Sequence, residues 1–172
     1  MTRVFAVTGI IALLLTAVSA NTGAESGQPK ETSTMSEFLE FGALQRPSSP
    51  NHWLVAPTDA DASLHPDAAA PRFQLPAERL ARAWLEVVKQ APRTRIVGIS
   101  TDGLQVEAEQ RSGLFGFIDK VSFHAVAVND ESSTFFAYSR SQTGYWDFGV
   151  NGRRLSNWVE ALQQMVSSQG TL

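Results

Sequence analysis

A dense run of polar side chains, from residue 139 to residue 154, contains the residue types best suited to chemistry in this chain. Serines and arginines alternate at its start, and an aspartate, three glycines and an asparagine follow. Arginine presents a planar fork of donors that matches a carboxylate or a phosphate at two points. The start of a helix adds free N–H groups and a dipole that favour negative charge. This combination is typical of an anion site or of a polar lock on the fold.

The strands predicted before this segment place Arg111, an arginine from outside it, near Arg140. Arg111 ends one predicted strand and Arg140 ends another. If both strands belong to one sheet, we expect the two arginines to converge with Asp119 and Asp147. The ligand would be an anionic small molecule or a component of the cell envelope. The candidate ligand-binding residues are Arg111, Ser112, Ser139, Arg140, Ser141 and Arg154.

A structural clasp is the competing interpretation of the same residues. Asp119 and Asp147 would neutralise the arginines within the protein, as is usual for buried arginines. Gly144 and Gly149 would supply backbone at positive φ, which turns the chain at little steric cost. Asn151 is placed to cap the start of the last helix. The sequence leaves both the clasp and the anion pocket open.

Signals for catalysis are weak in this chain. The G-x-S-x-G elbow of serine hydrolases is absent, and the arginines beside the serines stay protonated and cannot act as bases. One alternative function is a small hydrolase or transferase that uses Asp119 or Asp147 as its base. Another alternative is a structural accessory protein without a ligand. No phosphate loop or dinucleotide fingerprint occurs, so we expect no cofactor.

Composition excludes further classes of site and partner. The chain has no cysteine, and its histidines at 52, 65 and 124 lack the spacing of metal ligands, so we expect no metal site. The formal net charge is −3, whereas broad nucleic-acid binding needs a basic surface. We therefore expect no nucleic-acid partner.

The N-terminal segment resembles a secretory signal. Arg3 precedes an apolar run over residues 4–17, and Val18-Ser19-Ala20 supplies small residues for cleavage. We expect residues 1–20 to be a signal peptide and residues 21–46 a flexible spacer. The protein would then be periplasmic or secreted. In the alternative, residues 4–20 stay uncleaved as an inner-membrane anchor, which is the one case in which we expect a membrane partner.

The remaining chain, residues 47–172, is expected to form a single α+β domain. Residues 47–75 contain several prolines and are predicted to be an irregular arm. After the Asp102-Gly103 hairpin signal, Gln105, Glu107 and Glu109 alternate with apolar residues and should form the solvated face of a strand. An antiparallel sheet of about four strands, flanked by two amphipathic helices, follows from this pattern. The predicted order is a helix over 76–91, strands over 95–100, 104–109, 121–128 and 134–141, and a helix from about 152.

Several short motifs, spread from about residue 50 to residue 162, carry a resemblance to a known family. They are Pro50-Asn51 with Leu54 and Pro57, then Arg111-Ser112 with Phe117 and Asp119, and finally Ser139, Arg140, Ser141, Gly144, Asp147, Gly149, Asn151 and Arg154. On these residues the chain resembles the bacterial family catalogued as domain of unknown function 1499. Gln142, Tyr145 and Gly152 stand where family members often carry arginine, so this chain is less basic around the turn. The resemblance implies no particular activity, cofactor or catalytic residue.

Overall fold

The computed structural model describes residues 38–113 and 116–169, which belong to one compact unit. The expected signal peptide and the first part of the expected spacer lie outside the described residues. Within the described ranges, no helix combines the length and the apolar character needed to cross a bilayer.

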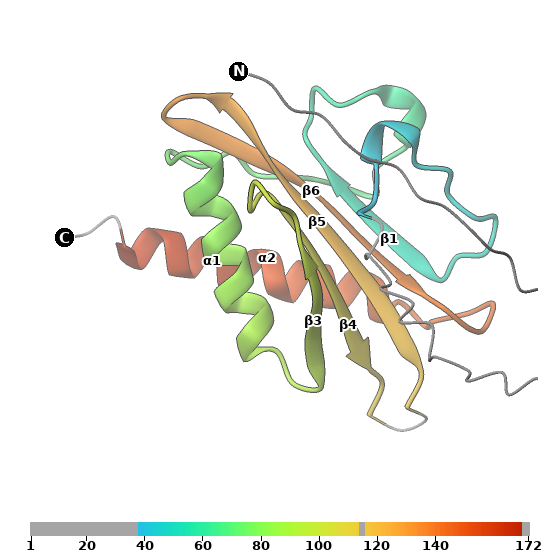
Figure 1. The fold of residues 1–172 in the computed structure, drawn as a ribbon. Coiled ribbons are helices and arrows are strands. Elements are labelled where there is room, and N and C mark those ends of the chain that lie inside the picture. The colour runs from blue at the N-terminus through green and yellow to red at the C-terminus, as the bar shows by residue number, and fades with distance from the viewer. Residues whose placement is uncertain (1–37, 114–115, 170–172) are drawn as a thin grey trace, which may run out of the picture. The chain divides into compact units, whose positions relative to one another are not determined.

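One six-stranded sheet organises the fold, in the order β2-β1-β6-β5-β4-β3 (Figure 1). All neighbouring strands are antiparallel except the short parallel pair β1 and β2. The architecture is the expected α+β class, but the prediction of about four strands was wrong. The strands are β1 (His52–Ala56), β2 (Ala68–Ala69), β3 (Thr94–Ile99), β4 (Gln105–Arg111), β5 (Ile118–Asn129) and β6 (Ser132–Ser141).

The two additional strands lie in the arm that was predicted to be irregular. β1 is an apolar stretch whose Leu54, Val55 and Ala56 are buried, and it pairs with β6 rather than with a neighbour in sequence. Leu54 faces Tyr138 across this pair. Because the partner strand lies more than eighty residues away, local sequence around β1 contains no hairpin signal.

Two helices cover one face of the sheet. α1 (Ala77–Gln90) starts after Pro76, and α2 (Val150–Gln169) ends the described chain. Both turn an apolar stripe toward the strands, as the helical spacing predicts. Trp84 of α1 stacks on Phe123 of β5 with ring centroids 4.4 Å apart, and it meets Trp158 of α2 edge-on at 5.6 Å. Aromatic packing therefore joins both helices to the sheet.

The opposite face of the sheet is covered only in part. Phe41 lies in the short 3-10 turn η1 (Phe41–Ala43) and packs beside Phe136, with ring centroids 5.2 Å apart. A second turn, η2 (Ala62–Leu64), buries Leu64 in the same small cluster. Residues 38–46 were expected to close a flexible spacer, yet this segment packs on the sheet through buried Phe41. The cover lies over part of the sheet that includes β1 and β6.

Candidate functional site

A buried polar cluster, held between α2 and the sheet, contains most of the residues predicted for the clasp. Arg154 is its centre, with a side chain only 3% exposed. Its Nη2 donates to Asp119 Oδ2, and its Nη1 donates to Ser139 Oγ at 2.8 Å. Its Nε donates to Gln110 Oε1 at 2.6 Å. Every side of the guanidinium is thus occupied by protein groups, which leaves Arg154 no free edge for a ligand.

Asn151 joins this cluster to β1 and to the preceding turn. Its Nδ2 donates to the carbonyl of Asn51 at 2.9 Å and to Asp147 Oδ2 at 2.8 Å, and its Oδ1 accepts from Ser139 Oγ at 2.6 Å. The prediction of Asn151 as the helix cap was wrong. Asp147 takes that role, because its carboxylate accepts the N–H groups of Gly149 and Asn151. Asn151 is one residue inside the helix, where its side chain turns toward the sheet.

The turn before α2 depends on glycine at two positions. Gly144 has φ of 88° and Gly149 has φ of 73°, a region that L side chains rarely adopt. The Gly144 carbonyl accepts a hydrogen bond from the Asn51 side chain. The turn therefore holds β1 as well as the start of α2.

Arg111 and Arg140 do not meet Asp119 and Asp147, so the predicted convergence was wrong. In the β5–β6 register Asp119 faces Ser141 and Lys120 faces Arg140. Successive side chains of a strand point to opposite faces, so Ser139 and Ser141 face the helices and Arg140 faces the other way. Arg154, supplied by α2, takes the place expected for the strand arginines. Counting alternation from the buried Val121 and Phe123 could have revealed this split.

A row of charged side chains crosses the second face of the sheet, away from the helices. The cross-strand pairs are Arg95 with Glu109, Glu109 with Lys120, Lys120 with Arg140, and Arg140 with His52. Arg95 is ion-paired with Glu109, its Nη2 lying 2.8 Å from Oε2. The row thus places the cations Lys120 and Arg140 directly opposite each other.

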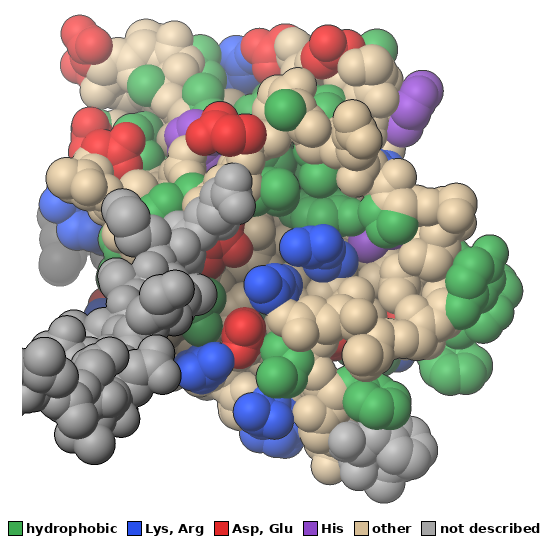
Figure 2. Space-filling view, turned by 45° about the vertical axis from the view of Figure 1, so that its right-hand side comes forward, with side chains coloured by type: hydrophobic (Ala, Val, Ile, Leu, Met, Phe, Trp, Pro, Cys, Tyr) green, Lys and Arg blue, Asp and Glu red, His purple; other side chains and the backbone are tan. Residues whose placement is uncertain are grey.

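Two further arginines extend the row at the same end of the sheet. Arg93 and Arg111 line a surface groove of about 300 Å³ together with Arg95 and Glu109. We call the set Arg93, Arg95, Arg111, Lys120 and Arg140 the basic surface. Grouped basic side chains are visible in the lower part of Figure 2. Ser112, one of the predicted ligand-binding residues, is at the edge of this set. Its hydroxyl accepts a hydrogen bond from the N–H of Phe117 at 3.0 Å.

Lys120 is half-buried and Arg140 is exposed, and both lie near enough to the buried Glu107 for their charges to act on its pKa. Among residues 38–113 and 116–169, neither side chain has an ion-pair or hydrogen-bond partner. Like charges directly opposite on neighbouring strands are destabilising. The arrangement is therefore unfavourable for the isolated fold and suited to an anion between the two side chains.

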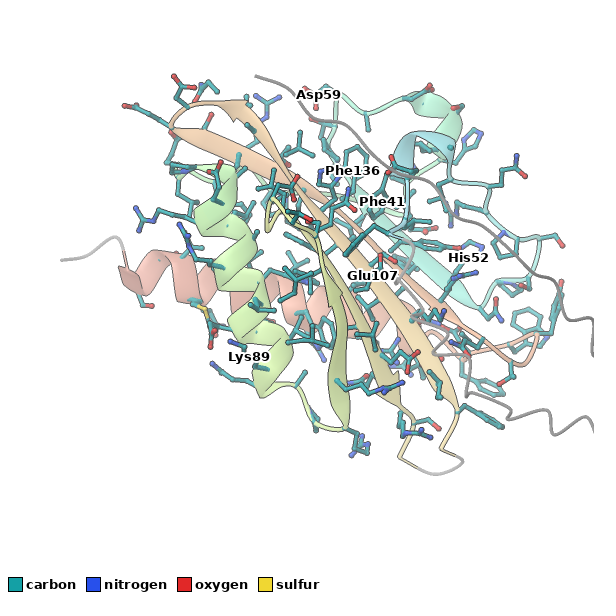
Figure 3. The ribbon with its side chains drawn as sticks, viewed as in Figure 1. Phe41, His52, Asp59, Lys89, Glu107 and Phe136 are labelled. Carbon is teal, nitrogen blue, oxygen red and sulfur yellow. The ribbon has the colours of Figure 1, made fainter. Side chains whose placement is uncertain are left out.

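Glu107 is buried beneath this region, although the strand pattern predicted a solvated side chain. Only 8% of the residue is exposed, and it lies on the side of the sheet that Phe41 and Leu39 cover (Figure 3). Ser122 Oγ donates to Oε2 at 2.7 Å, and the N–H of Leu39 donates to Oε1 at 3.3 Å. Burial raises the pKa of Glu107, and this effect outweighs the lowering by these hydrogen bonds and by the charges of Lys120 and Arg140.

The raised pKa of Glu107 predicts a pH-dependent effect of Glu107→Gln. The folded state binds this proton more tightly than the unfolded state, so the ionised carboxylate lowers stability as pH rises through the raised pKa. Below the ordinary glutamate pKa the group is protonated in both states and the cost is absent. We expect Glu107→Gln to be more stable than the parent at neutral pH, with the difference vanishing in acid.

Urea denaturation across a pH series measures this difference. Glu131→Gln, an exposed change in the β5–β6 turn, is the matched control and should show no such gain. A Glu107→Gln protein that is less stable than the parent at neutral pH would contradict the prediction. Attraction of the carboxylate to Lys120 and Arg140 would then exceed the cost of burial.

Neither aspartate is arranged as a general base. Asp119 is 4% exposed and is held by Arg154, whereas a base needs access to the substrate proton. Asp147 accepts the N–H groups of Gly149 and Asn151 at the start of α2. No group of three or more potential metal-ligating side chains occurs within the described part of the chain. His124 packs near the Phe41 ring at 6.4 Å, and burial lowers the pKa of its imidazole.

Comparisons with known proteins place the chain in a family without adding a function. The family model described as Protein of unknown function (DUF1499) matches residues 43–162, which confirms the resemblance seen in the sequence. No curated protein matches the chain. Solved structures that resemble it include the crystal structure of TTHA0849 from Thermus thermophilus, at 10% identity. That match covers 60% of this chain and 97% of the other at a TM-score of 0.34, too slight a likeness to carry a functional argument.

Proposed function

We propose that this chain, which belongs to the DUF1499 family of proteins of unknown function, is a non-catalytic module that binds anions through its basic surface. As part of the same proposal, the protein works in the periplasm or after secretion, and its ligand is an envelope component. The anion site lies on the second face of the sheet, at Lys120 and Arg140. Arg154 and Asp119 hold the fold rather than the ligand.

The observation that carries the proposal is the direct opposition of Lys120 and Arg140 across β5 and β6. The nearest carboxylate in the row, Glu109, is already engaged by Arg95. Glu107 lies in the neighbouring row, but it is buried and accepts hydrogen bonds from Ser122 Oγ and from the N–H of Leu39. Lys120 and Arg140 lie side by side, and the neighbouring Glu109 is already paired with Arg95. A phosphate or carboxylate could therefore bind between the two cations.

The distribution of charge over the chain supports the same conclusion. The whole sequence has a formal net charge of −3, yet five basic residues gather at one end of the sheet. A local excess of one sign raises the concentration of oppositely charged ligands near it. The basic surface is thus a specific feature of an otherwise acidic protein.

Thermal unfolding in inorganic phosphate tests the proposal, with sodium chloride adjusted so that ionic strength stays constant. A ligand that binds only the folded state raises the melting temperature. We expect phosphate to stabilise the parent and the control Arg82→Gln, which removes an exposed charge from α1. Lys120→Gln and Arg140→Gln should lose most of that phosphate effect. Without phosphate, both should stay within about 0.5 kcal/mol of the parent, as surface changes usually do.

Two outcomes would reject this function. One is a parent protein that phosphate does not stabilise beyond the effect of chloride. The other is equal stabilisation of the parent and of the Lys120→Gln/Arg140→Gln double variant, which would place the binding elsewhere. Strong unfolding of Arg140→Gln in the absence of phosphate would also assign Arg140 to the structure of the fold.

A further inference from the structure

Four aromatic side chains protrude beside the start of α2 and the start of β5. We call Phe117, Tyr145, Trp146 and Phe148 the aromatic tip. Their exposed fractions are 52%, 59%, 66% and 85%, respectively. Large apolar rings at such exposure lose the burial that normally stabilises them, and exposed apolar groups that gather together mark interaction sites.

The aromatic tip borders a hollow and does not form a buried core of its own. Phe117, Trp146 and Phe148 line this hollow of about 310 Å³. Tyr145 and Trp146 meet edge-on, with ring centroids 5.4 Å apart. Phe148 is held in a left-handed backbone conformation, φ 54°, and its carbonyl accepts a hydrogen bond from Arg153 Nη1 at 2.9 Å. A local constraint thus keeps the most exposed ring in this position.

The aromatic tip and the basic surface occupy the same end of the sheet. The N–H of Ser112 donates to the carbonyl of Phe117 at 2.8 Å, directly beyond Arg111 at the end of β4. Across the strands, Arg111 faces Ile118, the residue after Phe117. The loop that carries the other three rings begins at Gln142, two residues after Arg140. The N–H of Gln142 donates to the Ile118 carbonyl at 3.1 Å. Rings and cations therefore lie at one end of the sheet, the rings around a hollow that includes Asp119 and Ser141 and the cations on the other face.

We infer that the aromatic tip enters the interfacial region of an anionic lipid bilayer, toward which the basic surface draws the protein. This inference rests on the proposed function, since it names lipid headgroups as the source of the anions. Tryptophan and tyrosine favour the headgroup level of a bilayer, and basic residues are attracted to anionic lipids within a Debye length. Stable attachment takes two signals, and the tip and the basic surface supply both.

The sequence offers a separate reason for choosing a bilayer as the partner. The apolar run over residues 4–17 is expected to be either a signal peptide or an anchor, and each of these brings the chain to a membrane. A protein partner would also bury exposed rings. The charge beside these rings, however, is a spread of cations across four strands, which suits an extended anionic surface.

Fluorescence of the full chain mixed with lipid vesicles tests the inference. Vesicles of phosphatidylcholine are compared with vesicles that also contain phosphatidylglycerol, each with brominated acyl chains that quench tryptophan. Trp84 and Trp158 are buried and Trp53 is half-buried. The difference in quenching between the parent and Trp146→Phe therefore reports on Trp146. We expect quenching of Trp146 only when phosphatidylglycerol is present, and we expect added salt to reduce it.

Variants of the tip provide the second measurement. We expect Phe117→Ser/Phe148→Ser to weaken binding to phosphatidylglycerol vesicles by about tenfold or more, because two inserted rings are lost. The control Ile99→Ser removes an exposed apolar side chain from β3 and should bind as the parent does. Circular dichroism verifies that each variant is folded.

The possible failures separate this inference from the proposed function. If Trp146 is not quenched while phosphate still stabilises the protein, the bilayer is wrong and the anion site stands. If both vesicle types bind equally and the tip variants have no effect, the N-terminal apolar run drives binding and the inference is overturned. If phosphate and phosphatidylglycerol both have no effect, the inference and the function fail together.

Discussion

Arg154→Met is expected to lower the free energy of unfolding by about 3–5 kcal/mol, because it leaves the buried Asp119 carboxylate without its charge partner. Both side chains of this ion pair are almost completely buried, at 3% and 6% exposure. The same substitution removes the donors to Ser139 and Gln110. Urea denaturation followed by circular dichroism measures the loss.

A double variant distinguishes a lost charge partner from lost packing. Replacing both members of a buried pair with apolar residues often costs little, so Arg154→Met/Asp119→Leu should recover much of the stability. Arg153→Met, next along α2 and exposed, is the control and should stay within about 1 kcal/mol of the parent. An Arg154→Met protein as stable as the parent would show that the clasp does not hold the fold, and Arg154 would again be available as a ligand for anions.

Asn151→Ala is the second large effect, at about 2–4 kcal/mol, because several buried polar groups each lose a hydrogen bond. The Asn51 carbonyl loses one of its two donors and keeps the Ser141 N–H, and Ser139 Oγ loses its acceptor. The Asp147 carboxylate keeps the N–H groups of α2 but loses the side-chain bond. Since Asn151 is completely buried, water cannot replace it without rearrangement of the cluster.

Asn157→Ala is the matched control, since it removes an exposed asparagine from the same helix. Its expected effect is within about 0.5 kcal/mol, as for other surface positions. Hydrogen exchange adds a local readout for Asn151→Ala. Protection should fall first in β1 and at the start of α2, the two elements that Asn151 joins. Equal loss of protection over the whole sheet would contradict a local role.

The sequence pattern was sufficient for elements whose partners are close along the chain. The stripe of α1, the Asp102-Gly103 hairpin and the alternation of β5 each depend on spacing within a few residues. β1 escaped prediction because its partner β6 is distant, and because prolines on both sides made the arm look irregular. Glu107 was misplaced for a similar reason, since Leu39, which contacts it, is 68 residues away in the sequence.

The sequence predicted which residues form the candidate site better than it predicted how these residues are arranged. Asp119, Asp147 and Asn151 do meet in one hydrogen-bonded cluster with Arg154. Arg111 and Arg140 fall on the opposite face, because strand alternation separates side chains that are adjacent in sequence. The opposition of Lys120 and Arg140 depends on strand register, which a single sequence does not specify.

The position of β1 in the sheet also constrains the order in which the molecule can be assembled. β1 is the first strand of the described chain, yet its antiparallel partner is the last strand, and its lock is the Asn151 amide in the final helix. Closing such a long loop costs conformational entropy before the contacts between β1 and β6 can form. This step therefore slows folding. The apolar segment Trp53-Leu54-Val55 must therefore stay unpaired until β6 has been synthesised, and its bond to Asn151 forms later still. A growing or translocating chain would reach its native topology only once nearly all of it is present.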